Sequence, residues 1–173
     1  MSKIERAPIE GLLALPGFPV VLVTAAHNVM TAAAFSFGSF KPPCVMVGIL
    51  PENLTHDLIV DRGEFGINLP SVDQLDAVRA CGSVSGRDAD KFARAGLTPQ
   101  KSVALDSDLI AECPLSLECR VVHTARFGGS HTWFVGEILA AHVDEDYAWD
   151  QALLFWRGEY RRLGGVLHQA GRR

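Results

Sequence analysis

Several hydroxyl, amide and basic residues have the types and positions needed to hold an anion. Asn53 and Thr55 stand where a short helix is expected to begin, and the free amides and dipole of a helix start favour negative charge. A glycine- and serine-rich loop then precedes Lys91, whose ammonium would add a positive charge. Simple helix capping and a solvated lysine explain the same residues, so they are only candidates for an anion site: Asn53, Thr55, Ser83, Ser85, Gly86 and Lys91.

A run of small side chains and one histidine form a second group of candidates. Residues 31–34 (TAAA) would let a flat ligand approach the backbone closely, although a tightly packed strand needs small residues too. His131 stands in a Gly-Ser-His turn, and an imidazole side chain suits proton transfer or the orientation of a substrate. A lone turn histidine also serves simply as a hydrogen-bonding group. His123 and His142 lie on expected strands without any motif.

The cysteines do not indicate a metal or redox site. They stand at positions 44, 81, 113 and 119, with no CxxC pair and no close histidine. A zinc cage and a thioredoxin motif are therefore not expected. We interpret the four cysteines as small buried thiols.

Composition favours one globular domain over residues 1–173. Of the 173 residues, 48% are hydrophobic and 21% are charged, which is typical of a packed core. The net charge of −4 and the absence of a basic stripe argue against nucleic acid as a partner. The longest apolar stretches, 18–26 and 45–50, are shorter than the ~20 residues of a membrane helix. With no basic and apolar leader, the cytoplasm is the expected location.

Strands predominate in the expected secondary structure. A turn is expected at His27 and Asn28, and a capping box at Ser71 to Gln74 predicts a helix to about Ala80. A loop over 82–86 and a second short helix from Asp88 to Ala95 follow, with Gly96 ending that helix. Strands are expected over 18–26, 29–37, 44–50, 64–69, 115–124 and 132–143.

This order of elements predicts an antiparallel barrel. Many strands joined by tight turns, with only short helices between them, do not give the regular alternation of a doubly wound sheet. The tail over about 148–173 mixes aromatic and basic residues. We expect the tail to pack on the barrel or on a second subunit.

Seven segments between about residues 18 and 143 resemble the flavin reductase-like, FMN-binding split-barrel family, and within it the flavoredoxin branch. They occur in the same order and with the same spacing as in that family. Together they are far more specific than any one alone. The segments are 28–33 (NVMTAA), 41–43 (KPP), 53–55 (NLT), 64–68 (EFGIN), 85–92 (SGRDADKF), 112–119 (ECPLSLEC) and 129–137 (GSHTWFVGE).

The resemblance implies a mainly β fold, a six-stranded Greek-key split barrel with short inserted helices that forms homodimers, with flavin mononucleotide (FMN) near the subunit interface. It places the flavin ring and ribityl chain against the second strand and the phosphate at the loop after the third. His131 would lie near the flavin face and the nicotinamide. Relatives carry an aromatic residue just after the MT pair, where this chain has Ala33 and Ala34, so either the ring is less covered here or Phe35 substitutes for that residue. The implied cofactor-binding residues are Asn28, Met30, Thr31, Ala32, Ala33, Phe35, Asn53, Thr55, Ser83, Ser85, Gly86 and Lys91.

Three functions remain open at this point. The first is an NAD(P)H-dependent flavin reductase that passes electrons through flavin to a second acceptor. The second is an electron carrier of the flavoredoxin type, which holds FMN tightly and exchanges electrons with a redox partner protein. The third is a flavin-free interaction barrel, since a fold does not determine a function. No GxGxxG fingerprint is present, so a preference for NADH or NADPH is not readable.

Overall fold

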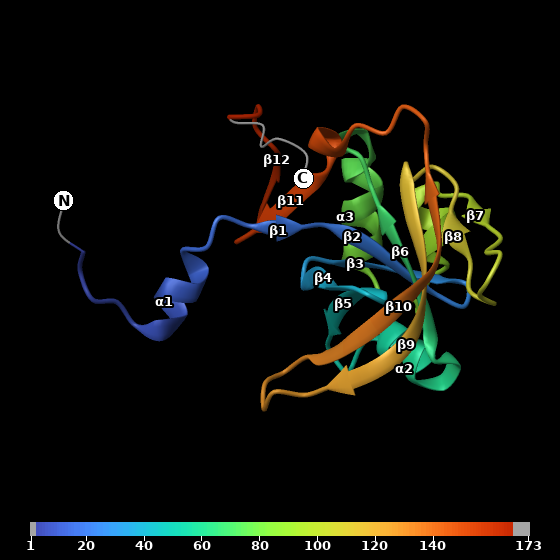
Figure 1. The fold of residues 1–173 in the computed structure, drawn as a ribbon, viewed down its shortest axis with the longest axis horizontal. Coiled ribbons are helices and arrows are strands. Elements are labelled where there is room, and N and C mark those ends of the chain that lie inside the picture. Colours follow the sequence, from blue (N-terminus) through green and yellow to red (C-terminus); the bar gives the residue numbers. More distant parts are fainter. Residues whose placement is uncertain (1–2, 168–173) are drawn as a thin grey trace.

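One antiparallel sheet organises the computed structural model, which describes residues 3–167 (Figure 1). Its seven strands have the order β3-β2-β6-β9-β10-β5-β4. β5 and the next strand in sequence, β6, are separated in the sheet by β10 and β9, a long crossover typical of a Greek key. The strands are β2 (Val21–Ala25), β3 (Asn28–Ala32), β4 (Phe35–Phe40), β5 (Pro43–Ile49), β6 (Glu64–Leu69), β9 (Leu115–Ala125) and β10 (Thr132–Val143).

The sheet curls into a barrel, and its two edge strands are consecutive in the sequence. β3 and β4 lie at opposite ends of the strand order, yet only Ala33 and Ala34 separate them in sequence. Opposite this break, the Gly48 amide donates to the Ala34 carbonyl at 2.7 Å. If β3 and β4 are counted as one interrupted strand, the seven strands form a six-stranded barrel. The predicted barrel is confirmed, but the predicted strand over 29–37 is divided in two.

Both faces of the central strands are buried. On β2, Val21 and Val23 point into the barrel core, while Leu22 points to the opposite face and joins a second cluster. That second cluster packs α3 (Leu75–Ser83) and α4 (Lys91–Ala95) against the outside of the barrel. Successive side chains of β2 point to opposite faces of the sheet. Because apolar residues cover both faces, β2 is buried throughout.

The helices begin and end close to their predicted signals. α2 (Leu54–Arg62) ends at Gly63, whose φ of 68° is left-handed. The predicted capping box forms, with the Ser71 amide donating to Gln74 Oε1 at 2.8 Å, but it opens a 3₁₀ turn, η1 (Val72–Gln74), before α3. α3 continues to Ser83 rather than ending near Ala80. The cap of α4 is Asp90, which accepts from the Ala93 amide at 3.2 Å, and not Asp88 as predicted.

The turn between β2 and β3 lies one residue earlier than predicted. Ala26 and His27 form it, and Asn28 is the first residue of β3. Ala26 has a φ of 51°, a left-handed conformation that alanine rarely adopts. Its amide donates to Ser107 Oγ at 2.8 Å, and its carbonyl accepts from the Asp108 amide at 3.0 Å. Contacts from a distant loop therefore fix this turn.

The carboxylate of Glu118 is fully buried inside the fold. Glu118, on β9, accepts hydrogen bonds from the Val103 and Ala104 amides at 2.9 and 2.6 Å and bonds His142 Nε2 at 2.7 Å. Burial alone would raise the pKa of Glu118, but these hydrogen bonds outweigh burial and hold the pKa below its usual value. Ionised Glu118 thus ties the 103–104 loop to the barrel, and His142 has a structural partner.

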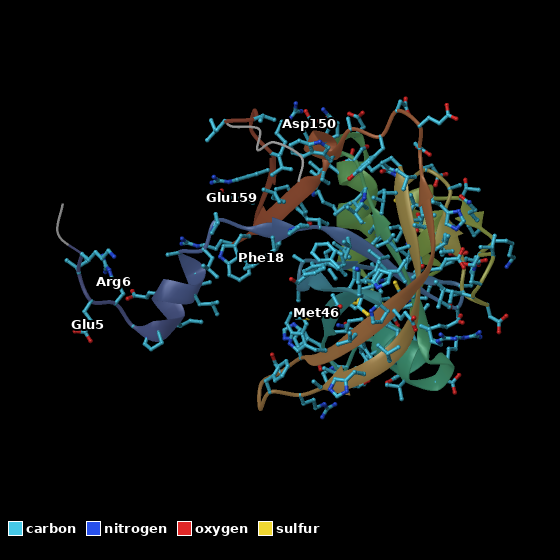
Figure 2. The ribbon with its side chains drawn as sticks, viewed as in Figure 1. Glu5, Arg6, Phe18, Met46, Asp150 and Glu159 are labelled. Atoms are coloured by element: carbon cyan, nitrogen blue, oxygen red, sulfur yellow. The ribbon has the colours of Figure 1, made fainter. Side chains whose placement is uncertain are left out.

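The two ends of the described chain lie outside the barrel sheet. β1 (Phe18–Pro19), β11 (Leu153–Trp156) and β12 (Glu159–Arg162) form a separate three-stranded sheet. Leu153, Phe155 and Tyr160 pack on the cluster outside the barrel, as expected for the tail, and residues 168–173 of the tail lie outside the described residues. α1 (Pro8–Leu13) stands clear of the barrel in Figure 1, and Glu5 and Arg6 point into open space in Figure 2. The remaining elements are η2 (Trp149–Gln151), β7 (Pro99–Gln100) and β8 (Leu109–Ile110). Nowhere in residues 3–167 is a helix long and apolar enough to cross a membrane.

Candidate functional site

Two adjoining hollows lie along β3, and Met30 and Asn53 line both of them. The smaller, polar hollow has a volume of about 30 Å³ and is bounded by β3, the start of α2 and the loop between α3 and α4. The larger hollow, about 150 Å³, extends along the break between β3 and β4. The first is lined by Asn28, Met30, Asn53, Leu54, Thr55, Val84, Ser85, Gly86 and Lys91, and the second by Met30, Thr31, Ala32, Ala33, Ala34, Gly48, Leu50, Asn53 and His131.

A buried ammonium group borders the polar hollow. Lys91 is only 7% exposed, and its Nζ donates to the Cys81 carbonyl at 2.8 Å. Among residues 3–167, no carboxylate oxygen lies within 4.0 Å of this nitrogen. Burial lowers the pKa of Lys91 because the charged form loses hydration. A buried cation without a carboxylate partner is suited to an anionic ligand.

Three residues from three segments fit together beside Lys91. Asn28 Nδ2 donates to Thr55 Oγ1 at 2.8 Å, and both side chains are buried. A Cβ at Gly86 would stand 3.0 Å from Asn28 Cγ and still closer to Oδ1. Only glycine therefore lets the 84–90 loop lie directly against Asn28, and Ser85 and Gly86 line the hollow there.

The other basic residue of this loop already has a partner. Arg87 Nη2 donates to Asp57 Oδ2 at 2.6 Å, on the first turn of α2. This hydrogen bond lowers the pKa of Asp57. The Arg87–Asp57 pair connects the loop to α2 at the surface, whereas Lys91, the first residue of α4, lines the hollow and pairs with no carboxylate among residues 3–167.

The larger hollow is lined mainly by short and aliphatic side chains. Ala33, Ala34 and Gly48 bring backbone to its surface, and Leu50 and Met30 border it. A Cβ at Gly48 would lie 3.0 Å from the Trp133 ring and 3.2 Å from Ala34, so the strands pack closely here. The Thr31 hydroxyl donates to the Val78 carbonyl at 2.6 Å, which ties β3 to α3. Short side chains of this kind let a planar ring approach the backbone closely.

His131 is the ionisable side chain that lines this hollow. It precedes β10 and is half-buried, and its Nδ1 lies 3.0 Å from Ser130 Oγ. An imidazole at the edge of an apolar surface can orient a polar ligand or exchange a proton with it. His123 is exposed on β9, away from both hollows.

The structure brings together most of the residues predicted for the site. Two are not among the lining residues: Phe35 packs against the barrel core, and the Ser83 hydroxyl donates to the Ala80 carbonyl at 2.9 Å on the last turn of α3. Ala34, part of the run of small residues at 31–34, also lines a hollow, and the structure adds Gly48, Leu50, Leu54 and Val84. Gly48 and Leu50 carried no local signal, because they reach the hollow only through closure of the barrel.

The predicted residues that line the hollows are Asn28, Met30, Thr31, Ala32, Ala33, Asn53, Thr55, Ser85, Gly86, Lys91 and His131.

Comparison with known proteins agrees with this arrangement. A protein of Archaeoglobus fulgidus named only as uncharacterized is 37% identical over 131 residues, 76% of this chain and 73% of its own. A flavoredoxin structure from Methanosarcina acetivorans superimposes with a TM-score of 0.86 and 29% identity, covering 98% of this chain and 96% of that one. An FMN-binding protein of Thermus thermophilus shares the fold with a TM-score of 0.85 at 22% identity, over 98% and 99% of the two chains.

The family described as "Flavin reductase like domain" matches residues 16–164, which include both hollows and every strand of the barrel. The match also includes β1, β11 and β12, so the small outer sheet is part of the matched region. The split-barrel fold expected from the resemblance is confirmed. This chain belongs to the flavin reductase-like family.

Proposed function

We propose that this protein binds FMN along β3 and is an NAD(P)H-dependent flavin reductase, an oxidoreductase that passes electrons through the flavin to a second acceptor. One observation carries the proposal: a buried lysine, with no carboxylate partner among residues 3–167, lies at the polar end of a hollow that continues into one lined mainly by alanine, glycine and aliphatic side chains. FMN has the same asymmetry, because it joins a phosphate dianion to a planar, largely apolar ring.

The residues of the two hollows fit the parts of FMN. Lys91, Thr55 and Ser85 would hold the phosphate, together with backbone amides that the glycine at position 86 leaves accessible. Ala33 and Ala34 would carry the ring, with Met30 between the two ends. When bound, FMN supplies the ring that accepts and releases electrons.

His131 is the residue that we assign to catalysis. Its position at the apolar hollow lets the imidazole orient the nicotinamide donor or hold a proton near the ring end. The contact between Nδ1 and Ser130 Oγ restricts the rotation of the imidazole. We expect His131 to affect the rate of reduction rather than the affinity for flavin.

The test proceeds in two steps. The absorption spectrum of the purified protein, with and without added FMN, first reports whether flavin binds. Anaerobic mixing of the FMN-loaded protein with NADH or NADPH then measures loss of the flavin band at ~450 nm. Prompt bleaching supports a reductase, while a colourless protein that ignores added FMN would refute the flavin site.

Electron transfer without a nicotinamide donor is the second candidate function. The M. acetivorans structure that covers 98% of this chain is named a flavoredoxin, and a second flavoredoxin, from Desulfovibrio vulgaris, has the same coverage and identity. A holoprotein that retains FMN through gel filtration and is not bleached by NADH or NADPH, but is reduced by a protein or chemical donor, would favour this function.

We also propose that the protein acts as a homodimer. What supports this is exposed apolar surface on the barrel: Phe37 and Phe40 on β4 are 55% and 82% exposed, and Phe127, between β9 and β10, is 77% exposed. Exposed aromatic groups of this size commonly mark interfaces. Light scattering after size exclusion measures the mass, and a monomer at micromolar concentration would contradict the proposal.

A further inference from the structure

A histidine on the first turn of α2 is almost completely buried. His56 directly follows Thr55, and its side chain is only 12% exposed. Its Nε2 lies 3.1 Å from Thr132 Oγ1, whereas Nδ1 is buried and has no hydrogen-bond partner among residues 3–167. Most buried polar atoms in folded proteins are paired, and an exception of this kind often marks a functional constraint.

The hydroxyl of Thr132 indicates which nitrogen of His56 carries the proton. Arg126 Nε donates to Thr132 Oγ1 at 2.9 Å, so this oxygen already accepts one hydrogen bond. The hydroxyl hydrogen is then free to be donated to His56 Nε2, which requires the ring proton on Nδ1. That proton faces Asp57 Oδ1, which lies 3.6 Å from the nitrogen. The opposite tautomer would turn a bare lone pair toward this carboxylate, so the Nδ1–H form is favoured.

His56 thereby links two segments that are far apart in the sequence. The other oxygen of Asp57 accepts from Arg87 Nη2 at 2.6 Å, on the 84–90 loop. At the opposite end, Arg126 belongs to the turn between β9 and β10. We call this row of polar side chains the His56 network: Arg87, Asp57, His56, Thr132 and Arg126.

Each end of the His56 network adjoins a residue of the proposed site. Gly86, next to Arg87, lines the polar hollow, and His131, next to Thr132, lines the larger hollow. Thr132 is the first residue of β10 and is 3% exposed. Successive side chains of an extended segment point to opposite sides, so Thr132 can bond His56 while His131 faces the hollow.

Packing holds the His56 ring as well. The ring meets Phe134, on β10, edge to face, with centroids 5.4 Å apart and planes inclined by 62°. Phe134 is 1% exposed and belongs to the barrel core. The imidazole therefore stands between α2 and β10 and cannot turn freely. A ring fixed in this way transmits a displacement of Asp57 to Thr132 instead of absorbing it by rotation.

We infer that His56 is a positioning residue that couples the 84–90 loop to His131. It bonds Thr132 through one nitrogen and faces Asp57 with the other, so the placement of the loop and the placement of His131 depend on each other. For the reaction, this role rests on the proposed function, because a phosphate held at the loop would then fix the imidazole at the larger hollow. The coupling itself is a property of the ligand-free protein.

NMR of the ligand-free protein, labelled on its histidine ring nitrogens, tests the coupling. The nitrogen signals of His56 should be those of the Nδ1–H form. Arg87→Ala removes the loop end of the His56 network and should shift the ring signals of His131. Arg79→Ala, which removes an exposed arginine of α3 outside the network, is the matched control and should leave them unchanged.

Two variants of His56 interrupt the network at its centre. His56→Phe keeps an aromatic ring against Phe134 but has no polar atom, and His56→Gln can still bond Thr132 but presents no imidazole N–H to Asp57. In either background, Arg87→Ala should no longer shift the His131 signals. Thermal unfolding shows whether each variant folds, and His56→Gln decides the test if His56→Phe does not.

Reduction of the FMN-loaded protein tests the role in the reaction. His56→Phe should slow reduction by NADH or NADPH by roughly 10- to 100-fold, because a displacement of about 1 Å at a reacting group can cost about 100-fold. FMN affinity should change little, and His56→Gln, which keeps the bond to Thr132, should recover part of the rate. A residue needed only for stability would lower the unfolding temperature without this separation of rate from affinity.

Failure of the coupling differs from failure of the proposed function. If Arg87→Ala leaves the His131 signals unchanged, or shifts them equally in the His56→Phe background, the coupling is overturned. If the signals shift as expected but the protein binds no FMN or is not reduced by a nicotinamide donor, the coupling stands and the proposed function fails. If FMN is reduced in His56→Phe as fast as in wild type, the role of His56 in the reaction is overturned.

Discussion

Gly86→Ala should damage the polar end of the site without altering a charge. The added Cβ would stand 3.0 Å from both Asn28 Cγ and Leu54 Cδ2 and closer still to Asn28 Oδ1. Gly86 is not among the left-handed glycines, so the backbone conformation itself is open to alanine. The cost is therefore a steric one, and either the loop or Asn28 has to move.

The size of the effect follows from what Asn28 holds. Its displacement breaks the buried hydrogen bond to Thr55 Oγ1, and a buried polar group left without its partner costs about 1–3 kcal/mol. The free variant can relax by moving the loop away. FMN bound as proposed would require the original arrangement, so we expect the FMN dissociation constant to rise by about 5- to 150-fold, the equivalent of that free energy.

Gly82→Ala is the matched control. Gly82 lies on α3, and a Cβ there would have Thr31 as its nearest neighbour at 3.5 Å, an ordinary contact. Alanine in a helix should stabilise the protein by roughly 0.5–1 kcal/mol and leave FMN affinity unchanged. Fluorescence titration and urea unfolding measure both properties. If Gly86→Ala bound FMN as tightly as Gly82→Ala, the packing of the loop on Asn28 would not serve the site.

Three other perturbations follow from the structure. Lys91→Ala should weaken FMN binding by about 1–3 kcal/mol in an equilibrium titration, and Lys41→Ala, on an exposed turn, should not; equal dissociation constants would remove Lys91 from the site. His131→Ala should slow reduction by NADH or NADPH in stopped-flow measurements more than it weakens FMN binding, and equal losses would indicate structural support only. Glu118→Gln should lower the free energy of unfolding by about 1–3 kcal/mol at neutral pH, because the ionised acceptor is lost. The pKa of Glu118 is lower in the folded protein than in the unfolded chain, so its stabilisation is present above the usual glutamate pKa and is lost as the pH falls through the folded pKa. The difference in free energy of unfolding between wild type and Glu118→Gln, measured in urea, should therefore shrink in acid. A difference that stays constant with pH would contradict this.

Strand bounds were predicted best where turn-forming residues stand at both ends of the strand. β6 and β10 have the predicted bounds, 64–69 and 132–143, because turn residues flank each of them. The break at Ala33 and Ala34 was missed, since nothing in their side chains opposes a strand. The break arises where the barrel closes and Ala34 bonds Gly48 on β5, a contact between distant parts of the chain.

The candidate site shows the same division. Lys91 and Thr55 were predicted because residue type and position near a helix start are visible locally. His56 carried no signal of its own, since its partner Thr132 lies far along the chain. The same distance hid the left-handed conformation of Ala26, and with it the true position of the turn.

Closure of the barrel and an apolar binding surface require the same residues. Where β3 gives way to β4, the chain must approach β5 closely enough for Gly48 to bond Ala34, and larger side chains would separate the strands. Small residues at this seam therefore leave a flat floor, and the hydroxyl of Thr31 bonds the Val78 carbonyl of α3. Polar groups for a ligand come instead from the loops beyond the seam, which carry Lys91. A ligand with a planar apolar part and a charged end is thus suited to the place where this barrel closes.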